Sequence, residues 1–132
     1  FIVPWSGEPV PLRAGSQDIG MAEDDRPCRL AYHGGRLPIA PDLESRAIRL
    51  GLAALRHLPG LRGYVGIDLI LGDVPEQDTL VEINARPTVA YAGLRRLARF
   101  RIPDLIVGKP VCVDWRPGIV RYRPDGDCDV QT

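Results

Sequence analysis

The feature that most constrains this chain is a pair of apolar segments at residues 64–71 and 79–86, separated by a short polar turn. The first segment is almost continuously apolar and carries a single carboxylate, Asp68, near its middle. Such runs are typical of strands that are covered on both faces. Pro75 lies in the turn and cannot donate a ladder hydrogen bond, so strand pairing should stop near it. The two segments therefore predict a β-hairpin.

The register of this hairpin predicts a cluster of polar side chains. Folding the second strand back about the turn places Asp68 opposite Glu82 or Asn84. Because side chains alternate along a strand, Glu82, Asn84 and Arg86 share one face, and the apolar residues between them face the other way. Two carboxylates, one amide and one guanidinium should therefore meet on a short patch of sheet.

These residue types suit a divalent metal site. Two carboxylates in a partly dry site raise each other's pKa unless a cation lies between them. The oxygen ligands of Asp68, Glu82 and Asn84 suit Mg²⁺ or Mn²⁺, and Arg86 could bind a developing anion. The alternative is a solvated sheet face, on which Asp68 simply pairs with Arg86.

The order Gly-x-Asp-Leu-Ile-Leu, a turn, then Val-Glu-Ile-Asn-x-Arg-Pro resembles the metal-binding end of the ATP-grasp superfamily of ATP-dependent carboxylate ligases. The resemblance implies that Asp68, Glu82 and Asn84 hold the magnesium ions that bridge the ATP phosphates. It also implies that Arg86 contacts the acyl phosphate or the substrate. The continuation Pro-Thr-Val-Ala-Tyr-Ala-Gly-Leu-Arg is similar to the branch that includes tyramine-glutamate ligase.

The same branch resembles the chain nearer its beginning. A strand that carries a small residue and a glutamine, here Gln17, is followed by an aromatic-Gly-Gly-x-x-Pro turn, here from His33 to Pro38. The resemblance implies that Gln17 lies near the nucleotide or the substrate. Surface hydrogen bonding is the alternative for a lone glutamine on a strand.

The remaining pattern predicts helices packed on a sheet. Pro41 opens a helix with acidic residues behind it and an apolar stripe reaching Leu55, and Pro87 opens a second helix to about Phe100. Other strands are predicted at residues 1–3, 9–12, 15–21, 28–32, 111–115 and 119–122, with turns at 33–35 and 116–118 and a polar loop at 23–27. The predicted fold class is α+β, a largely antiparallel sheet with two helices, as in a C-terminal ATP-grasp subdomain.

The chain of 132 residues is short for a complete nucleotide-dependent ligase. We therefore expect residues 1–123 to be the C-terminal part of an ATP-grasp domain, with residues 124–132 as a frayed tail. The resemblance implies that a lid with phosphate-binding lysines and an adenine-binding hinge lie elsewhere in a parent chain or on another subunit. Alone, the chain is expected to be inactive.

The resemblance implies a fragment of an ATP-dependent carboxylate-amine ligase, or a related ligase, that acts through an acyl phosphate. ATP and Mg²⁺ or Mn²⁺ would be its cofactors, and a small carboxylate and an amine acceptor its substrates. Two alternatives stay open: a non-catalytic structural or regulatory module, and a Mg²⁺-dependent phosphohydrolase, which would need a water-activating base.

Charge and composition exclude some classes of partner. Acidic and basic residues balance at 17 each, which argues against a nucleic-acid or anionic-membrane surface. The sequence has no long apolar span and no leader-like segment. Cys28, Cys112 and Cys128 are far apart, which favours reduced thiols in the cytoplasm over a disulfide framework or a zinc site.

Overall fold

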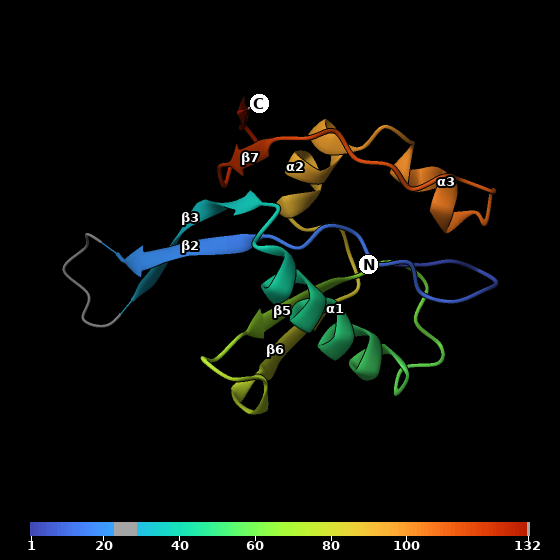
Figure 1. Cartoon of the computed structure of the whole chain (residues 1–132), viewed down its shortest axis with the longest axis horizontal. Helices are drawn as coiled ribbons and strands as arrows, with labels where there is room; N and C mark the ends of the chain where they lie inside the picture. Colours follow the sequence, from blue (N-terminus) through green and yellow to red (C-terminus); the bar gives the residue numbers. More distant parts are fainter. Residues whose placement is uncertain (23–28, 132) are drawn as a thin grey trace.

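The computed structural model describes residues 1–22 and 29–131, which form three antiparallel sheets and three helices (Figure 1). A four-stranded sheet has the order β2 (Ser16–Met21), β3 (Leu30–Leu37), β7 (Ile119–Tyr122) and β8 (Cys128–Gln131). Two smaller sheets pair β1 (Ile2–Val3) with β4 (Gly63–Tyr64) and β5 (Gly66–Ile70) with β6 (Thr79–Asn84). The helices are α1 (Pro41–Leu55), α2 (Ala90–Leu97) and α3 (Ile102–Ile106), and a 3₁₀ turn, η1 (Pro75–Gln77), joins β5 to β6. The predicted α+β class is confirmed.

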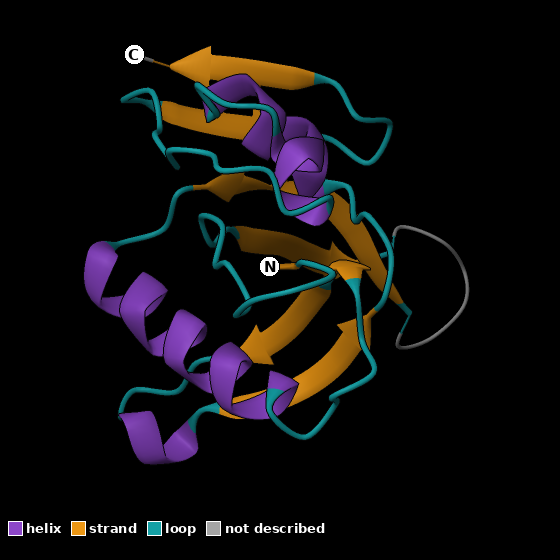
Figure 2. Ribbon diagram, turned by 90° about the vertical axis from the view of Figure 1, so that its right-hand side faces the viewer, coloured by secondary structure: helices purple, strands orange, loops and turns teal. Residues whose placement is uncertain are grey.

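Helix α1 forms where the sequence predicts it. Pro41 occupies the first turn, where its missing N–H is not needed, and Asp42 and Glu44 follow at the positive helix end. Its buried face includes Gly51, where a Cβ would lie 2.5 Å from the ring of Phe1. Figure 2 shows this helix lying alongside the β5–β6 hairpin.

Two hydrophobic clusters of unequal size hold these elements together. The larger consists of Ile2, Leu12, Leu37, Tyr64, Leu94, Leu97, Ala98, Ile102, Leu105, Val120 and Tyr122. The smaller consists of Val3, Leu55 and Val65, with Phe1, Leu61, Ile67 and Ile83 partly buried against it. The smaller cluster therefore lies under α1 and the hairpin, whereas the larger one lies under α2, α3 and β7.

The predicted turn at residues 33–35 is wrong, because β3 continues through it. Gly35 pairs with Gln17 and Gly34 with Asp18, and the register shifts between Asp18 and Ile19. Gly34 has φ +113°, and a Cβ there would lie 2.1 Å from the Tyr122 carbonyl oxygen. Close approach of neighbouring strands, and not chain reversal, is what these glycines permit.

The C-terminal third also differs from the prediction. Residues 111–115 form no strand of a hairpin; Trp115 makes an isolated bridge to Ala98, and β7 pairs with β3 and β8 instead. The tail expected to be frayed contains β8, which pairs Val130 with Val120. Covering the edge of β7 satisfies its backbone groups, which explains why this polar segment is ordered.

The helices after the hairpin are shorter than predicted. Helix α2 runs from Ala90 to Leu97 because Ala98 is already extended, with ψ 131°. The short helix α3 follows, with a proline in its first turn. Near the start of the chain, the strands predicted at 1–3 and 9–12 meet in a single bridge, in which Ile2 and Val10 exchange hydrogen bonds of 2.9 and 2.7 Å.

Some predictions fall outside the described residues. These are the polar loop at 23–27 and Cys28, the first residue of a predicted strand. Cys112 and Cys128 are free thiols. Within residues 1–22 and 29–131, no helix combines the length and the apolar character needed to cross a bilayer.

Candidate functional site

The β5–β6 hairpin brings the two predicted carboxylates together. Asp68 of β5 is the direct Cα partner of Glu82 of β6, and the register shifts immediately after Asp68. Asn84 pairs with Gly66 two residues further along the same strand. The packing at position 66 also requires glycine, because a Cβ there would lie 2.4 Å from Cγ2 of Thr88. The predicted register of this hairpin is therefore confirmed.

A cavity of about 910 Å³ opens in front of this pair. Its walls include residues of β2 and β3, of α1, of the β5–β6 hairpin with the residues that follow it, and of α2 and β7. All five side chains expected at the site line it: Gln17, Asp68, Glu82, Asn84 and Arg86. The fold thus gathers residues that lie up to 69 positions apart, from Gln17 to Arg86, at one cavity.

Two amide side chains hold the Asp68 carboxylate. Gln17 Nε2 donates to Oδ1 over 2.8 Å, and Asn84 Nδ2 donates to Oδ2 over 3.2 Å. Among the described residues, no salt bridge joins Asp68 to Arg86. The structure therefore does not contain the Asp68–Arg86 pair that was the alternative to a metal site.

The electrostatics of the pair favour a cation. Burial raises the pKa of Asp68, and the charge of Glu82 raises it further. The hydrogen bond from Gln17, the charge of Arg86 and the hydrogen bond from Asn84 act in the opposite direction without cancelling this shift. A positive ion between the two carboxylates would remove the repulsion that destabilises the ionised form.

The donor set fits Mg²⁺ or Mn²⁺. Two carboxylates and an amide oxygen leave several coordination positions for water and phosphate oxygens, which is how Mg²⁺ is usually bound. Asn84 now turns its amide nitrogen toward Asp68, so rotating the amide by half a turn would present its oxygen instead. In the described part of the chain, no three histidine, cysteine, aspartate or glutamate side chains are grouped to hold a metal.

Comparison with known protein families assigns the chain to a family. A family model described as an ATP-grasp domain matches residues 5–90, which are 86 of the 132 residues. The chain belongs to the ATP-grasp family. No curated protein and no solved structure matches the chain.

Membership of the ATP-grasp family indicates which ligands the domain binds. ATP-grasp domains bind ATP and typically Mg²⁺, and the family is one of ATP-dependent ligases. The matched range contains Gln17, Asp68, Glu82, Asn84 and Arg86, and it stops where α2 begins, at Ala90. The candidate site therefore lies wholly within the ATP-grasp part of the chain.

Sequence patterns did not identify the tyrosines that line the cavity beside Asp68 and Glu82. Three of the four tyrosines in the chain, Tyr32, Tyr64 and Tyr122, line it. The fourth, Tyr91, packs edge-on against Tyr64 with ring centroids 5.7 Å apart. Burial raises the pKa of Tyr122, and the neighbouring Tyr32 phenol raises it further, so Tyr122 stays an uncharged hydrogen-bond donor.

No spacing in the sequence could have linked these tyrosines, because Tyr32 and Tyr122 belong to strands far apart in the chain. The link is the pairing of β3 with β7, in which Tyr122 faces Gly35. Tyr32 is 37% exposed and faces the exposed Ile19 across β2 and β3. The cavity therefore joins an acidic end to an aromatic and apolar wall, which suits a ligand with both charged and uncharged parts.

Proposed function

We propose that this chain supplies the metal- and ATP-binding hairpin of a ligase that joins a carboxylate to an amine through an acyl phosphate. One observation carries the proposal: Asp68 and Glu82 face each other across the hairpin of an ATP-grasp domain, and together with Asn84 and Arg86 they line one cavity. This arrangement places the oxygen ligands of Asp68, Glu82 and Asn84 and the guanidinium of Arg86 around the same cavity.

The proposed metal ligands are Asp68, Glu82 and Asn84. Magnesium ions held there would neutralise the like charges of the ATP phosphates and the attacking carboxylate. Gln17 acts on Asp68 by donating a hydrogen bond from its amide to Oδ1, which fixes the orientation of the carboxylate. In this proposal Gln17 supports the nucleotide site as an orienting residue.

Arg86 is the proposed catalytic residue. It is exposed at the cavity, and Nη1 makes a long hydrogen bond of 3.4 Å to the Pro87 carbonyl. A guanidinium at this position can bind two oxygens of a phosphoryl or acyl-phosphate group at once. It would stabilise the negative charge that develops as the phosphoryl group is transferred.

Phosphate-binding lysines must come from elsewhere in this proposal. The single lysine of the sequence, Lys109, pairs with Asp104 of α3 over 3.2 Å. We propose that residues 1–123 correspond to the C-terminal part of an ATP-grasp domain. A lid in the same parent chain or on another subunit would complete the site. We also propose that the protein acts in the cytoplasm.

The substrate class is proposed from the sequence that follows the hairpin. The run from Pro87 to Arg95 is similar to the branch that includes tyramine-glutamate ligase, which favours a carboxylate-amine ligase. The cavity is compatible with such substrates because it combines charged residues with uncharged aromatic ones. On this proposal, ATP is consumed when both a carboxylate and an amine are present.

The test is Mg²⁺-dependent ADP release by the natural protein that contains this chain, measured across a panel of carboxylates and amines. Wild type is compared with Glu82→Ala and Asn84→Ala. Glu76→Ala is the matched control, because Glu76 is an exposed acid in η1 of the same hairpin. We expect release to need both substrates and to fall about 100-fold in both site variants, but not in the control. Release that is absent throughout, or equal in all four proteins, would contradict the proposal.

A further inference from the structure

The candidate site depends on a hairpin that has little support from other strands. Strands β5 and β6 form a two-stranded sheet, and such a pair is marginally stable by itself in water. A slip of one residue in its register would turn every side chain to the opposite face. Asp68 and Glu82 would then no longer face each other across it.

Asp78 links the two ends of the loop between β5 and β6. This residue directly precedes β6, and its Oδ1 accepts a hydrogen bond of 3.2 Å from the backbone nitrogen of Gly72, just after β5. The loop is tightly packed at this point, because a Cβ on Gly72 would lie 2.3 Å from Cβ of Gln77. One carboxylate thus joins the end of the first strand to the start of the second.

Helix α1 reaches the same point with Arg46. Its Nε donates to Asp78 Oδ2 over 3.0 Å, and its Nη2 donates to the Gly72 carbonyl over 2.7 Å and also pairs with Asp78 Oδ1. Both side chains are largely enclosed, with exposed fractions of 14% for Arg46 and 8% for Asp78. One guanidinium therefore binds both sides of the loop, a fixed geometry that lysine cannot reproduce.

We propose that Arg46 and Asp78 are positioning residues that fasten the β5–β6 hairpin to α1 and so keep Asp68 opposite Glu82. Neither residue is among the described residues that line the cavity, so their effect passes through the hairpin. The Arg46 guanidinium also holds the pKa of the Asp78 carboxyl below its usual range, so the pair stays charged at neutral pH. The consequence for metal binding rests on the proposed function, whereas the consequence for the hairpin does not.

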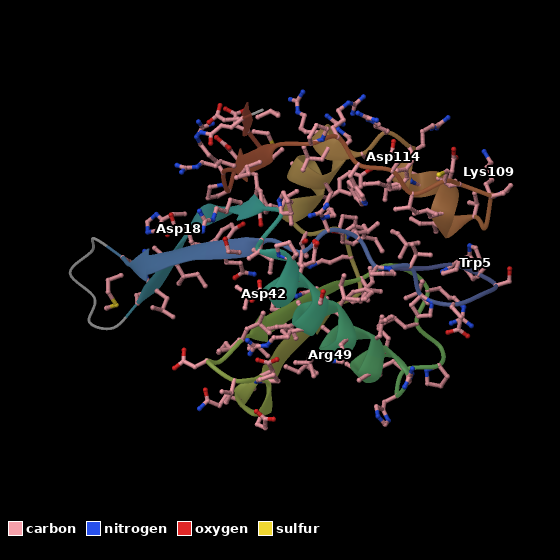
Figure 3. The ribbon with its side chains drawn as sticks, viewed as in Figure 1. Trp5, Asp18, Asp42, Arg49, Lys109 and Asp114 are labelled. Atoms are coloured by element: carbon pink, nitrogen blue, oxygen red, sulfur yellow. The ribbon has the colours of Figure 1, made fainter. Side chains whose placement is uncertain are left out.

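The experiment compares Arg46→Gln with Arg49→Gln in the full chain. Arg49 lies one turn further along α1 (Figure 3), is exposed and adds positive charge toward Asp78. Arg49 therefore has the same charge as Arg46 and lies on the same helix, but within the described residues it forms no salt bridge with Asp78. Amide hydrogen exchange of β5 and β6 and Mn²⁺ binding followed by electron paramagnetic resonance are the two measurements.

We expect Arg46→Gln to speed exchange in β5 and β6 at least about tenfold while exchange in β7 stays unchanged. Its Mn²⁺ affinity should fall roughly tenfold, as for other residues that orient metal ligands. Arg46→Lys should recover part of both effects, because its ammonium restores the charge without the fork. Arg49→Gln should match wild type in both measurements.

Several outcomes would overturn the inference. Unchanged hairpin exchange in Arg46→Gln would show that the hairpin does not depend on this ion pair. Faster exchange with unchanged Mn²⁺ affinity would show that the pair stabilises the loop without aligning the carboxylates. If wild type binds no Mn²⁺, the metal site of the proposed function fails, and hydrogen exchange alone still decides whether Arg46 holds the hairpin.

Discussion

Two regions of this molecule differ in how they are built: the packed half, around α2, α3 and β7, and the site half, around β5 and β6. Around α2, α3 and β7 the side chains are apolar and enclosed, with Leu97 and Val120 exposed by 1% and 0%. Around β5 and β6 the smaller cluster supports a hairpin whose outer face carries two opposed carboxylates beside a large cavity. One half is organised for packing, and the other keeps charge and open space.

The family match divides the chain in a related way. Seven of the eleven residues in the larger core follow residue 90, where the ATP-grasp match ends. The residues expected to do chemistry all precede it. Much of the larger core thus comes from a segment outside the match.

The largest effect is expected in the packed half. Leu97→Ala should lower the free energy of unfolding by about 2–5 kcal/mol, because it removes an enclosed side chain and leaves a cavity. Urea denaturation followed by circular dichroism measures this change. Leu58→Ala is the control, since Leu58 is 41% exposed and should change stability much less. Equal losses in the two variants would remove the contrast between the halves.

The junction between the halves should be nearly as sensitive. Gly35→Ala should cost about 1–3 kcal/mol, because its Cβ would lie 2.3 Å from the Ser16 carbonyl oxygen and 2.6 Å from Tyr122 Oη. Gly60→Ala is the matched control, since nothing lies within 4 Å of a Cβ there. Thermal denaturation of both variants tests this, and a Gly35→Ala protein as stable as wild type would argue against the close approach of β2, β3 and Tyr122.

The site half should respond with the opposite sign. In the metal-free protein, Glu82→Gln should raise the free energy of unfolding by about 0.2–1 kcal/mol, because it removes a like charge directly opposite Asp68. Glu76→Gln, in η1, serves as the control for loss of one negative charge. A destabilised Glu82→Gln protein would indicate that Glu82 has a stabilising partner, and the comparison of the halves would need revision.

The smallest effect concerns pH. The folded state raises the pKa of Asp68 above its usual value of 3.8, so the folded chain binds this proton more tightly than the unfolded chain. The contribution of Asp68 to the free energy of unfolding is therefore present at low pH and is lost as pH rises through the folded pKa. Asp78 behaves oppositely: its pKa is lowered, so its contribution is lost as pH falls through the folded pKa.

The pH prediction is checked by urea titrations of metal-free protein across the acidic range. Asp68→Asn should remove the part of the pH profile in which stability declines as the Asp68 carboxyl ionises. Asp78→Asn should remove the part in which stability rises as the Asp78 carboxyl ionises. Identical pH profiles for wild type and both variants would show that neither carboxyl differs between the folded and unfolded states.

Local sequence patterns were enough to predict the elements that depend on neighbours in the chain. The apolar run with Asp68, the return strand and Pro75 specify the hairpin and its register, and Pro41 with its apolar stripe specifies α1. These features depend on turn chemistry, side-chain alternation and helix-end preferences, all of which act over a few residues.

The features that were not predicted depend on distant partners. The Gly-Gly after His33 was predicted to turn, but Tyr122 packs against it and β3 runs on. Residues 128–131 have a strand pattern that becomes favourable once β7 offers an edge. Likewise, the sequence placed Gln17 near the site only through resemblance, whereas its bond to Asp68 spans 51 residues.

The placement of the aromatic residues gives the chain built-in spectroscopic reporters. Trp115 stacks edge-on against Phe100 at 5.1 Å beside the larger core, so its emission should follow the packed half. Trp5 is 68% exposed and should report mainly solvent. Tyr32 lines the cavity and is not part of the larger core, whereas Tyr64 and Tyr122 line the cavity and also belong to that core. Tyrosine absorbance should therefore respond both to filling of the cavity and to unfolding of the core, whereas Trp115 emission should follow the core, and both signals are available in the unmodified chain without an added label.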